Sequence, residues 1–220
     1  MEELVAAGVP SENIIQLPNG VETHDIAARS TYSLGDPARL IYVGRLHEQK
    51  GLDVLLAAFC ALQHRYRGSV RLDLVGDGPL TDALQNQANR LGITGSVVFW
   101  GRRDDVLARL QSADIFVLPS RAEGISNALL EAMACGLPVV VSKIPGNVDV
   151  IEHKKNGLQF AVDDPGSLTS SLLLLLDQPH LRRCLGQAGR RTVEDHYSLD
   201  HVADRYLMLY RAVLGEGNAF

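Results

Sequence analysis

Two glutamates, Glu123 and Glu131, stand eight positions apart in the stretch EGISNALLE. The first is followed by glycine in a loop-like context, whereas the second falls about one turn into an apolar helical run. A carboxylate with apolar neighbours needs a hydrogen-bonding partner, and the hydroxyl groups of a ligand would provide one. Two interpretations stay open at this point: both carboxylates flank one ligand, or Glu123 is solvated and Glu131 reaches a gap in the surface.

The backbone between these glutamates has the properties of an anion site. Its amides would lie at the N-terminus of a helix, where unpaired N–H groups and the positive end of the helix dipole attract phosphate. Gly124 would let a ligand approach the backbone closely. The amides concerned are those of Gly124, Ile125, Ser126 and Asn127.

The segment GRLHEQKG, residues 44–51, contributes two cations. It places Arg45 at the end of a predicted strand and Lys50 at the start of the next predicted helix. An arginine can grip a diphosphate as a two-pronged donor, and a lysine can act on it as a point charge. The alternative is a pair of exposed loop cations without a ligand.

The elements that would position these residues alternate between strands and helices. Short apolar runs predict buried strands, and apolar residues at helical spacing predict helices. Strands are predicted at Ile14–Leu17, Leu40–Val43, Arg71–Val75, Val97–Trp100, Ile115–Leu118 and Val139–Val141. Helices are predicted as a half-helix at the start of the chain, at Gly51–Gln63, from Pro79 onward, and at Asp104–Leu110, Asn127–Ala134, Pro165–Leu176, Gln178–His196 and Leu199–Leu214.

This alternation predicts right-handed crossovers and one parallel sheet covered on both faces. The fold class is therefore α/β: a doubly wound, Rossmann-like sheet with a helical C-terminal tail, formed as one domain by residues 1–220. In such sheets ligands bind at the carboxyl ends of the strands. The other residues expected at those ends are Gly44, Gly76, Arg102 and Arg103.

The composition disfavours several classes of function. The net charge of −5 argues against a nucleic-acid partner held by bulk electrostatics. Three cysteines without paired or metal-like spacing predict reduced thiols in a cytoplasmic protein, and no metal site is recognised. The missing GxGxxG fingerprint disfavours a dinucleotide-dependent dehydrogenase. No signal peptide is recognised, and no apolar run is long enough to span a bilayer.

Four segments occur in a telling order: YVGRLHEQKG, LVGDGP, VVFWGRRDDV and ADIFVLPSRAEGISNALLEAMACGLPVVVS. In this order they resemble the C-terminal half of a GT-B glycosyltransferase, most closely the large retaining family called family 4 or group 1. The resemblance runs from about Asn19 to the C-terminal helices. It implies a nucleotide-sugar-binding domain, the second half of a GT-B fold, with the N-terminal acceptor domain absent from this sequence.

The resemblance implies roles for the charged residues. Arg45 and Lys50 would hold the donor diphosphate and stabilise the charge that builds on the leaving group, without a metal ion or other cofactor. Glu123 and Glu131, the two glutamates of the family's E-x7-E motif, would bind the hydroxyls of the transferred sugar and of the ribose.

The resemblance also implies roles at the backbone and at the base. The amides of residues 124–127 would bind phosphate and sugar oxygens. Gly76 would line the base pocket, and Arg102 and Arg103 would border the base. One departure is that the family's GG-x-x-E appears here as PGNVD, in which Asp149 is shorter than the usual glutamate. This change weakens any inference about which sugar is bound.

The implied activity is retaining transfer of a hexosyl unit from a nucleoside-diphosphate sugar to a glycan or a lipid-linked acceptor, as in polysaccharide biosynthesis. The implied partners are the donor and the missing N-terminal acceptor domain, and a peripheral contact of the full-length protein with the inner membrane is left open. The isolated chain is expected to transfer little or nothing. The alternative function is a non-catalytic module that binds a nucleotide or a nucleotide sugar.

Overall fold

The computed structural model describes residues 7–11, 14–15 and 17–214. The half-helix predicted at the start of the chain lies mostly outside these residues, and so does part of the predicted strand Ile14–Leu17. The residues of that strand that are described do not form a strand.

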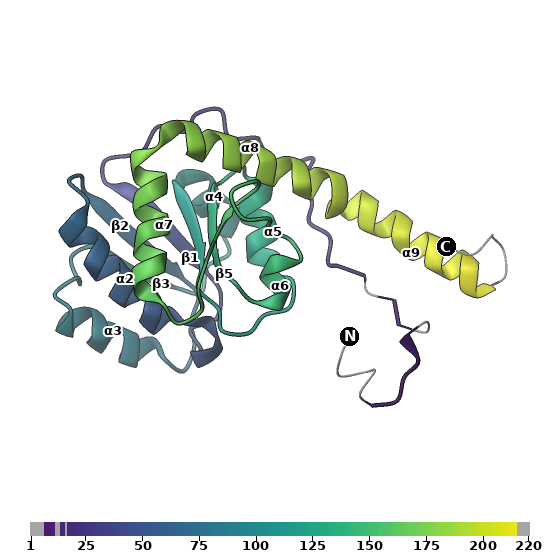
Figure 1. The fold of residues 1–220 in the computed structure, drawn as a ribbon, viewed down its shortest axis with the longest axis horizontal. Coiled ribbons are helices and arrows are strands. Elements are labelled where there is room, and N and C mark those ends of the chain that lie inside the picture. Colours follow the sequence, from purple (N-terminus) through teal and green to yellow (C-terminus); the bar gives the residue numbers. More distant parts are fainter. Residues whose placement is uncertain (1–6, 12–13, 16, 215–220) are drawn as a thin grey trace.

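The centre of the described structure is a six-stranded parallel sheet with the order β3-β2-β1-β4-β5-β6 (Figure 1). Its strands are β1 (Ala38–Val43), β2 (Val70–Val75), β3 (Val97–Gly101), β4 (Ile115–Leu118), β5 (Val139–Ser142) and β6 (Leu158–Phe160). Because β1 and β4 are neighbours, the chain winds outward from this pair in two opposite directions. The doubly wound α/β fold is therefore confirmed, and ligands bind such sheets in the crevice above this pair.

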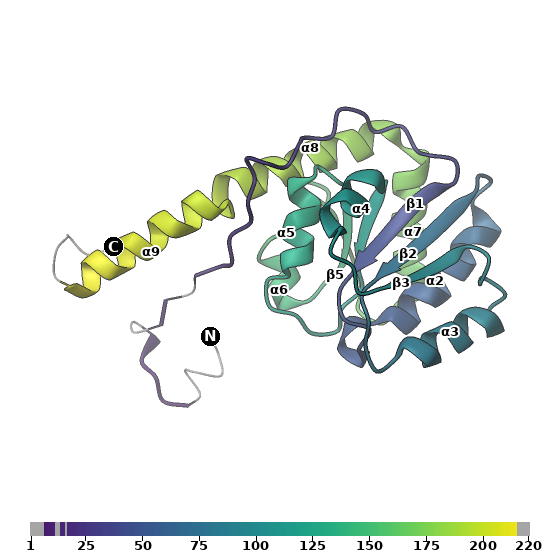
Figure 2. The ribbon, with the colours of Figure 1, turned by 180° about the vertical axis from the view of Figure 1, so that it is seen from behind.

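Helices cover both faces of the sheet (Figures 1 and 2). One face carries α2, α3 and α7, the other carries α4 and α5, and α8 packs against α5. The bounds are η2 (Glu48–Lys50), α2 (Leu52–Arg65), α3 (Thr81–Arg90), α4 (Val106–Ser112), α5 (Asn127–Ala134), α6 (Pro145–Val148), α7 (Pro165–Asp177), α8 (Pro179–His196) and α9 (Leu199–Leu214). In both views α9 extends away from the body as the expected helical tail. None of the helices in the described part of the chain combines the length and apolar character that crossing a bilayer requires.

Some helix boundaries differ from the prediction for local reasons. Gly51 has a left-handed backbone, with φ 62°, so α2 begins one residue later, at Leu52. Pro79 lies in a turn, and α3 begins at Thr81. The elements α6 and β6 were not predicted at all, because four and three residues are too few to show a periodicity.

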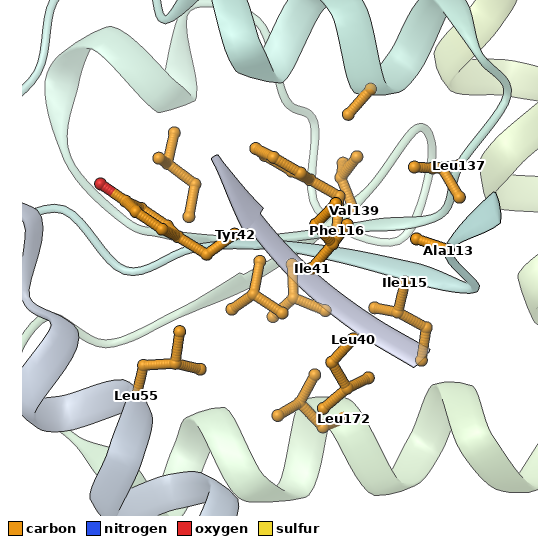
Figure 3. Close-up of a cluster of buried hydrophobic side chains, with 14 of the residues drawn as sticks. Leu40, Ile41, Tyr42, Leu55, Ala113, Ile115, Phe116, Leu137, Val139 and Leu172 are labelled. Atoms are coloured by element: carbon orange, nitrogen blue, oxygen red, sulfur yellow. The ribbon is translucent and has the colours of Figure 1, made fainter. Parts of the chain in front are cut away.

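The core fixes the strand that leads into the crevice. Leu40, Ile41 and Tyr42 of β1 are buried. Figure 3 shows Leu55 of α2 and Leu172 of α7 directed at β1 from the same side. Since packed interiors deform little, the end of β1 and the residues after it are held on a rigid base.

The segment before β1 is tied to the sheet by a largely buried ion pair. Arg29 Nη2 lies 2.9 Å from Asp114 Oδ1, and their side chains are only 13% and 6% exposed. Asp114 Oδ2 also accepts the backbone N–H groups of Gly35 and Arg39, at 3.2 Å and 2.9 Å. Asp114 stands immediately before β4, so this cluster secures the second strand of the central pair.

Candidate functional site

The loops that follow β1 and β4 lie against each other at the carboxyl edge of the sheet. The backbone N–H of Arg121 donates to the carbonyl of Gln49 at 2.7 Å. A Cβ atom at Gly51 would lie 2.2 Å from the carbonyl oxygen of Pro119, so a glycine is needed for this approach. The two loops that carry the predicted site residues therefore meet at one edge of the sheet, where a doubly wound fold has its ligand crevice.

Lys50 and Glu123 form an ion pair across this crevice. Lys50 Nζ is bonded to Glu123 Oε2, and the two side chains are 23% and 14% exposed. The Ser120 hydroxyl donates to the same carboxylate oxygen at 2.9 Å. No described residue donates to the other oxygen, Oε1, which leaves it available to a ligand hydroxyl. The ammonium predicted to bind diphosphate is thus already paired with the carboxylate predicted to bind sugar.

Arg45 differs from Lys50 because its guanidinium is exposed and bonded to no described residue. Its backbone is nevertheless fixed, since the buried Tyr42 hydroxyl donates to the Arg45 carbonyl at 3.0 Å. Burial raises the pKa of Tyr42 well above its usual range, and the nearby Glu123 charge raises it further. The phenol is therefore a neutral donor throughout the physiological range, and Arg45 is presented by a rigid backbone with its charge unneutralised.

The turn that leads into α5 offers unused donors. None of the four amides of residues 124–127 donates a hydrogen bond to a described residue. Ser126 is the backbone N-cap of α5, but its hydroxyl makes no capping bond. Around Gly124 no atom lies within 4 Å of the position that a Cβ would occupy. Four N–H groups at the positive end of a helix are thus left for an anion.

Glu131 lies further along α5 and is half-buried between the buried Leu130 and Ala132. Burial raises the pKa of its carboxyl above the ordinary value. No hydrogen bond or ion pair joins this carboxylate to a residue that the structure describes. The role of Glu131 in binding a ligand hydroxyl stays a prediction.

Replacing Glu131 with glutamine is expected to stabilise the unliganded chain at pH 7. The folded-state pKa lies above 4.5, so the charged form is disfavoured by folding, and the wild type gains stability as the pH falls through that pKa. The mutant should melt about 1–3 °C higher at pH 7, and the difference should vanish below about pH 4. Thermal denaturation from about pH 3 to about pH 8 measures this, with the exposed Glu152→Gln as control. A mutant that melts lower than the wild type at pH 7 would contradict the absence of a protein partner.

Position 76, directly after β2, requires glycine for a structural reason that the sequence did not reveal. A Cβ at Gly76 would lie 2.0 Å from the carbonyl oxygen of Gly44, and Gly76 N donates to the Gly101 carbonyl at 2.9 Å. The close approach at Gly76 is therefore made by the neighbouring backbone. The role of Gly76 in a base pocket stays a prediction.

Arg102 and Arg103, the two arginines that follow β3, are exposed. Arg103 Nε is paired with Asp105 Oδ1 at 3.1 Å. Arg102 is bonded to no described residue. Their role at the border of the base stays a prediction.

Arg121 was missed by sequence reasoning. Its guanidinium lies 2.7 Å from Asp53 of α2 and 2.7 Å from Asp163, which precedes α7. It also donates to the Glu48 carbonyl at 2.8 Å. These contacts hold the loop after β4 to the body, and they join positions 68 and 42 apart, so no local spacing could have indicated them.

A cavity of the described structure lies elsewhere, between α6, β6 and α8. It has a volume of about 1080 Å³, and its lining includes Lys143, Glu152, Asn156 and Arg191. None of the predicted site residues lines it. Within the described residues, no three His, Cys, Asp or Glu side chains gather as a metal site would need, and metal-free chemistry stays a prediction.

The chain is similar in sequence to known proteins over most of its length. A family model described as Glycosyl transferases group 1 matches residues 37–178. The GDP-mannose-dependent alpha-(1-6)-phosphatidylinositol monomannoside mannosyltransferase of Mycolicibacterium smegmatis is 32% identical over 209 residues, which cover 87% of this chain and 53% of that protein. The chain spans about half the length of the curated relatives it matches.

Solved structures show the same fold. HepE of Anabaena in complex with UDP and glucose has a TM-score of 0.87 at 21% identity, over 96% of this chain and 60% of that one. The C-terminal domain of LpcC, a group 1 family glycosyl transferase from Francisella tularensis, has a TM-score of 0.72 at 22% identity, over 82% of this chain and all of that domain. At these identities the likeness shows the fold alone.

Proposed function

This chain belongs to the group 1 glycosyltransferases, and on that premise we propose that it is the donor-binding half of a retaining hexosyltransferase. Its ligand would be a nucleoside-diphosphate sugar bound in the crevice between the loops after β1 and β4. The observation that carries the proposal is the ion pair of Lys50 and Glu123, which joins the loop after β1 to the loop that carries the four unused amides.

The charges of the crevice fit a diphosphate. Arg45 is unneutralised, and the amides of residues 124–127 have no partner among the described residues. Guanidinium and amide donors bind phosphate oxygens strongly in a partly desolvated site. Lys50, which is paired with Glu123 in the unliganded chain, would turn its ammonium toward the diphosphate. In transfer these donors would stabilise the charge that develops on the leaving nucleoside diphosphate, which is the largest task of the protein in such a step.

The carboxylates fit the hydroxyl groups on either side of that diphosphate. Glu123 Oε2 is held by Lys50 and Ser120, so Oε1 is the oxygen that would accept from a sugar hydroxyl. A carboxylate anchored in this way orients the sugar rather than attacking it. Glu131, unpaired and half-buried, would accept from the ribose. Transfer would need no metal, because Arg45, Lys50 and the helix amides supply the positive charge.

The donor and acceptor classes follow from the relatives. One relative is named as GDP-mannose-dependent, and one structure of the same fold holds UDP and glucose. UDP-linked sugars and GDP-mannose are therefore the first donors to test. The acceptor would be a glycan or a lipid-linked intermediate, bound mainly by an N-terminal domain. The enzyme would act in the cytoplasm and touch the membrane only peripherally.

A thermal-shift panel tests the proposal directly. The chain would be melted with UDP, GDP and ADP, and with UDP-glucose, GDP-mannose and ADP-glucose. A ligand at about 100 times its Kd stabilises by about 2.7 kcal/mol. We expect the diphosphate and the sugar conjugate of one base to raise the melting temperature together. If none of the six ligands does so, the proposal is wrong.

Glu123→Ala then separates a donor site from a plain nucleotide module. Because Glu123 is placed at the sugar, its loss should weaken the sugar conjugate while leaving the nucleoside diphosphate unaffected. If Glu123→Ala lowers the affinity for both ligands equally, or changes neither affinity, a module that binds only the nucleotide portion is favoured.

A further inference from the structure

Behind Glu123 lies a chain of buried polar groups that no motif indicated. We infer that Ser120, Ser142 and Asn147 form a positioning relay that keeps the Glu123 carboxylate directed at the donor sugar. This inference rests on the proposed function, because it concerns the residue placed at the sugar. All three side chains belong to residues with no exposed surface.

The relay can be followed bond by bond from the crevice inward. The Ser120 hydroxyl donates to Glu123 Oε2 at 2.9 Å. The Ser142 hydroxyl donates to the Ser120 carbonyl. Asn147 Nδ2 donates to the Ser142 carbonyl at 2.9 Å and lies 3.2 Å from the Ser142 hydroxyl. The end of β5 and the helix α6 are thereby linked to the loop after β4.

The helix α6 also presses directly on the loop that carries Glu123. A Cβ at Gly146 would lie 2.2 Å from the Gly124 carbonyl oxygen and 2.4 Å from that of Glu123. The loop is thus held from behind by backbone contact and by the three polar side chains. This explains how a glutamate in a loop can keep one orientation without a second charged partner.

Ser120 becomes decisive when a diphosphate binds. In the unliganded structure Glu123 Oε2 accepts from both Lys50 and Ser120. A diphosphate would draw the Lys50 ammonium toward itself, and among the described residues Ser120 would then be the one donor left on that oxygen. The hydroxyl therefore keeps the carboxylate in place in the state in which the sugar is present.

Asn147 supports this interpretation because its side-chain oxygen lacks a hydrogen-bond partner among the described residues. Its Oδ1 is the one buried side-chain nitrogen or oxygen in the described residues that has no hydrogen-bond partner. A buried unpaired polar atom costs about 1–3 kcal/mol. An asparagine held at that cost by contacts to Ser142 is better explained by positioning than by stability.

The test compares two ligands in each variant. Affinities for UDP and UDP-glucose, or for GDP and GDP-mannose if the panel selects guanine, are measured by calorimetry. In Ser120→Ala and in Ser142→Ala we expect affinity for the sugar conjugate to fall about threefold or more, with affinity for the diphosphate unchanged. Ser120→Thr keeps the hydroxyl and should restore the sugar conjugate.

The matched control is Thr169→Val on α7. Thr169 is also buried, and its hydroxyl lies within hydrogen-bonding distance of the carbonyl oxygens of Ala58 and Pro165, at 3.1 Å and 2.7 Å, away from the crevice. The Thr169→Val variant should have a lower melting temperature but an unchanged ratio of the two affinities, because the hydroxyl that it loses is purely structural. If Ser120→Ala does not fold, the ratio in Ser142→Ala decides.

The outcomes distinguish a failure of the proposed function from a failure of the relay. If Glu123→Ala leaves the affinity for the sugar conjugate unchanged, the proposed function is wrong. If Glu123→Ala weakens binding of the sugar conjugate but both serine variants keep full affinity for it, only the relay is wrong. Loss of both ligands in equal proportion would also overturn it, because it would mark the serines as structural.

Discussion

Replacing Arg45 with alanine is expected to weaken binding of the nucleoside diphosphate about tenfold or more, equivalent to about 1.4 kcal/mol. The guanidinium is exposed and bonded to no described residue, so its full charge is available to phosphate. Its backbone is fixed by the Tyr42 hydroxyl, so only the side chain has to be ordered on binding. Lys50→Ala is expected to weaken binding to a similar degree, and it also releases Glu123 from its ion pair.

Calorimetry with UDP or GDP, whichever the panel selects, measures these losses. Arg45→Lys keeps the charge and loses the two-pronged donor, so it should bind with intermediate affinity. Arg67→Ala, another exposed arginine, is the control for general charge and should bind as the wild type does. Unchanged affinity in both Arg45→Ala and Lys50→Ala would remove the diphosphate from this crevice.

Replacing Gly146 with alanine is expected to damage both stability and binding. The added Cβ would lie 2.2 Å and 2.4 Å from two backbone carbonyl oxygens of the Glu123–Gly124 loop, so backbone has to move. Overpacking of this kind costs about 1–3 kcal/mol, which lowers the melting temperature by roughly 2–10 °C for a chain of this size. Because the displaced loop carries the free amides, affinity for the sugar nucleotide should fall by about tenfold or more.

Gly95→Ala is the matched control for this substitution. No atom lies within 4 Å of its would-be Cβ, and its backbone is not left-handed. This variant should melt and bind as the wild type does. Gly146→Ala that keeps the wild-type affinity would show that α6 does not support the binding loop.

The fold and the position of the crevice could be predicted because both depend on local patterns. Alternating apolar runs and helical periodicity indicated five of the strands, and the rule of strand ends placed Arg45 and Glu123 at one edge. That prediction needed only the order of the elements.

The partnerships inside the crevice could not be predicted because they join distant positions. Lys50 and Glu123 pair across 73 positions, and Ser142 reaches the Ser120 carbonyl across 22. No periodicity or spacing rule relates such residues. The reason for Gly76 was hidden likewise, since the atom that excludes a side chain there is the carbonyl oxygen of Gly44, which follows the neighbouring strand β1.

Backbone chemical-shift mapping of the labelled chain, titrated with the sugar nucleotide that the panel selects, tests the central claim most directly. The account predicts that the largest changes fall on the amides of residues 124–127 and on Gly44 and Arg45. The cavity between α6, β6 and α8, lined by Asn156 and Arg191, offers the competing location. Changes centred there, with the amides of residues 124–127 undisturbed, would contradict the account.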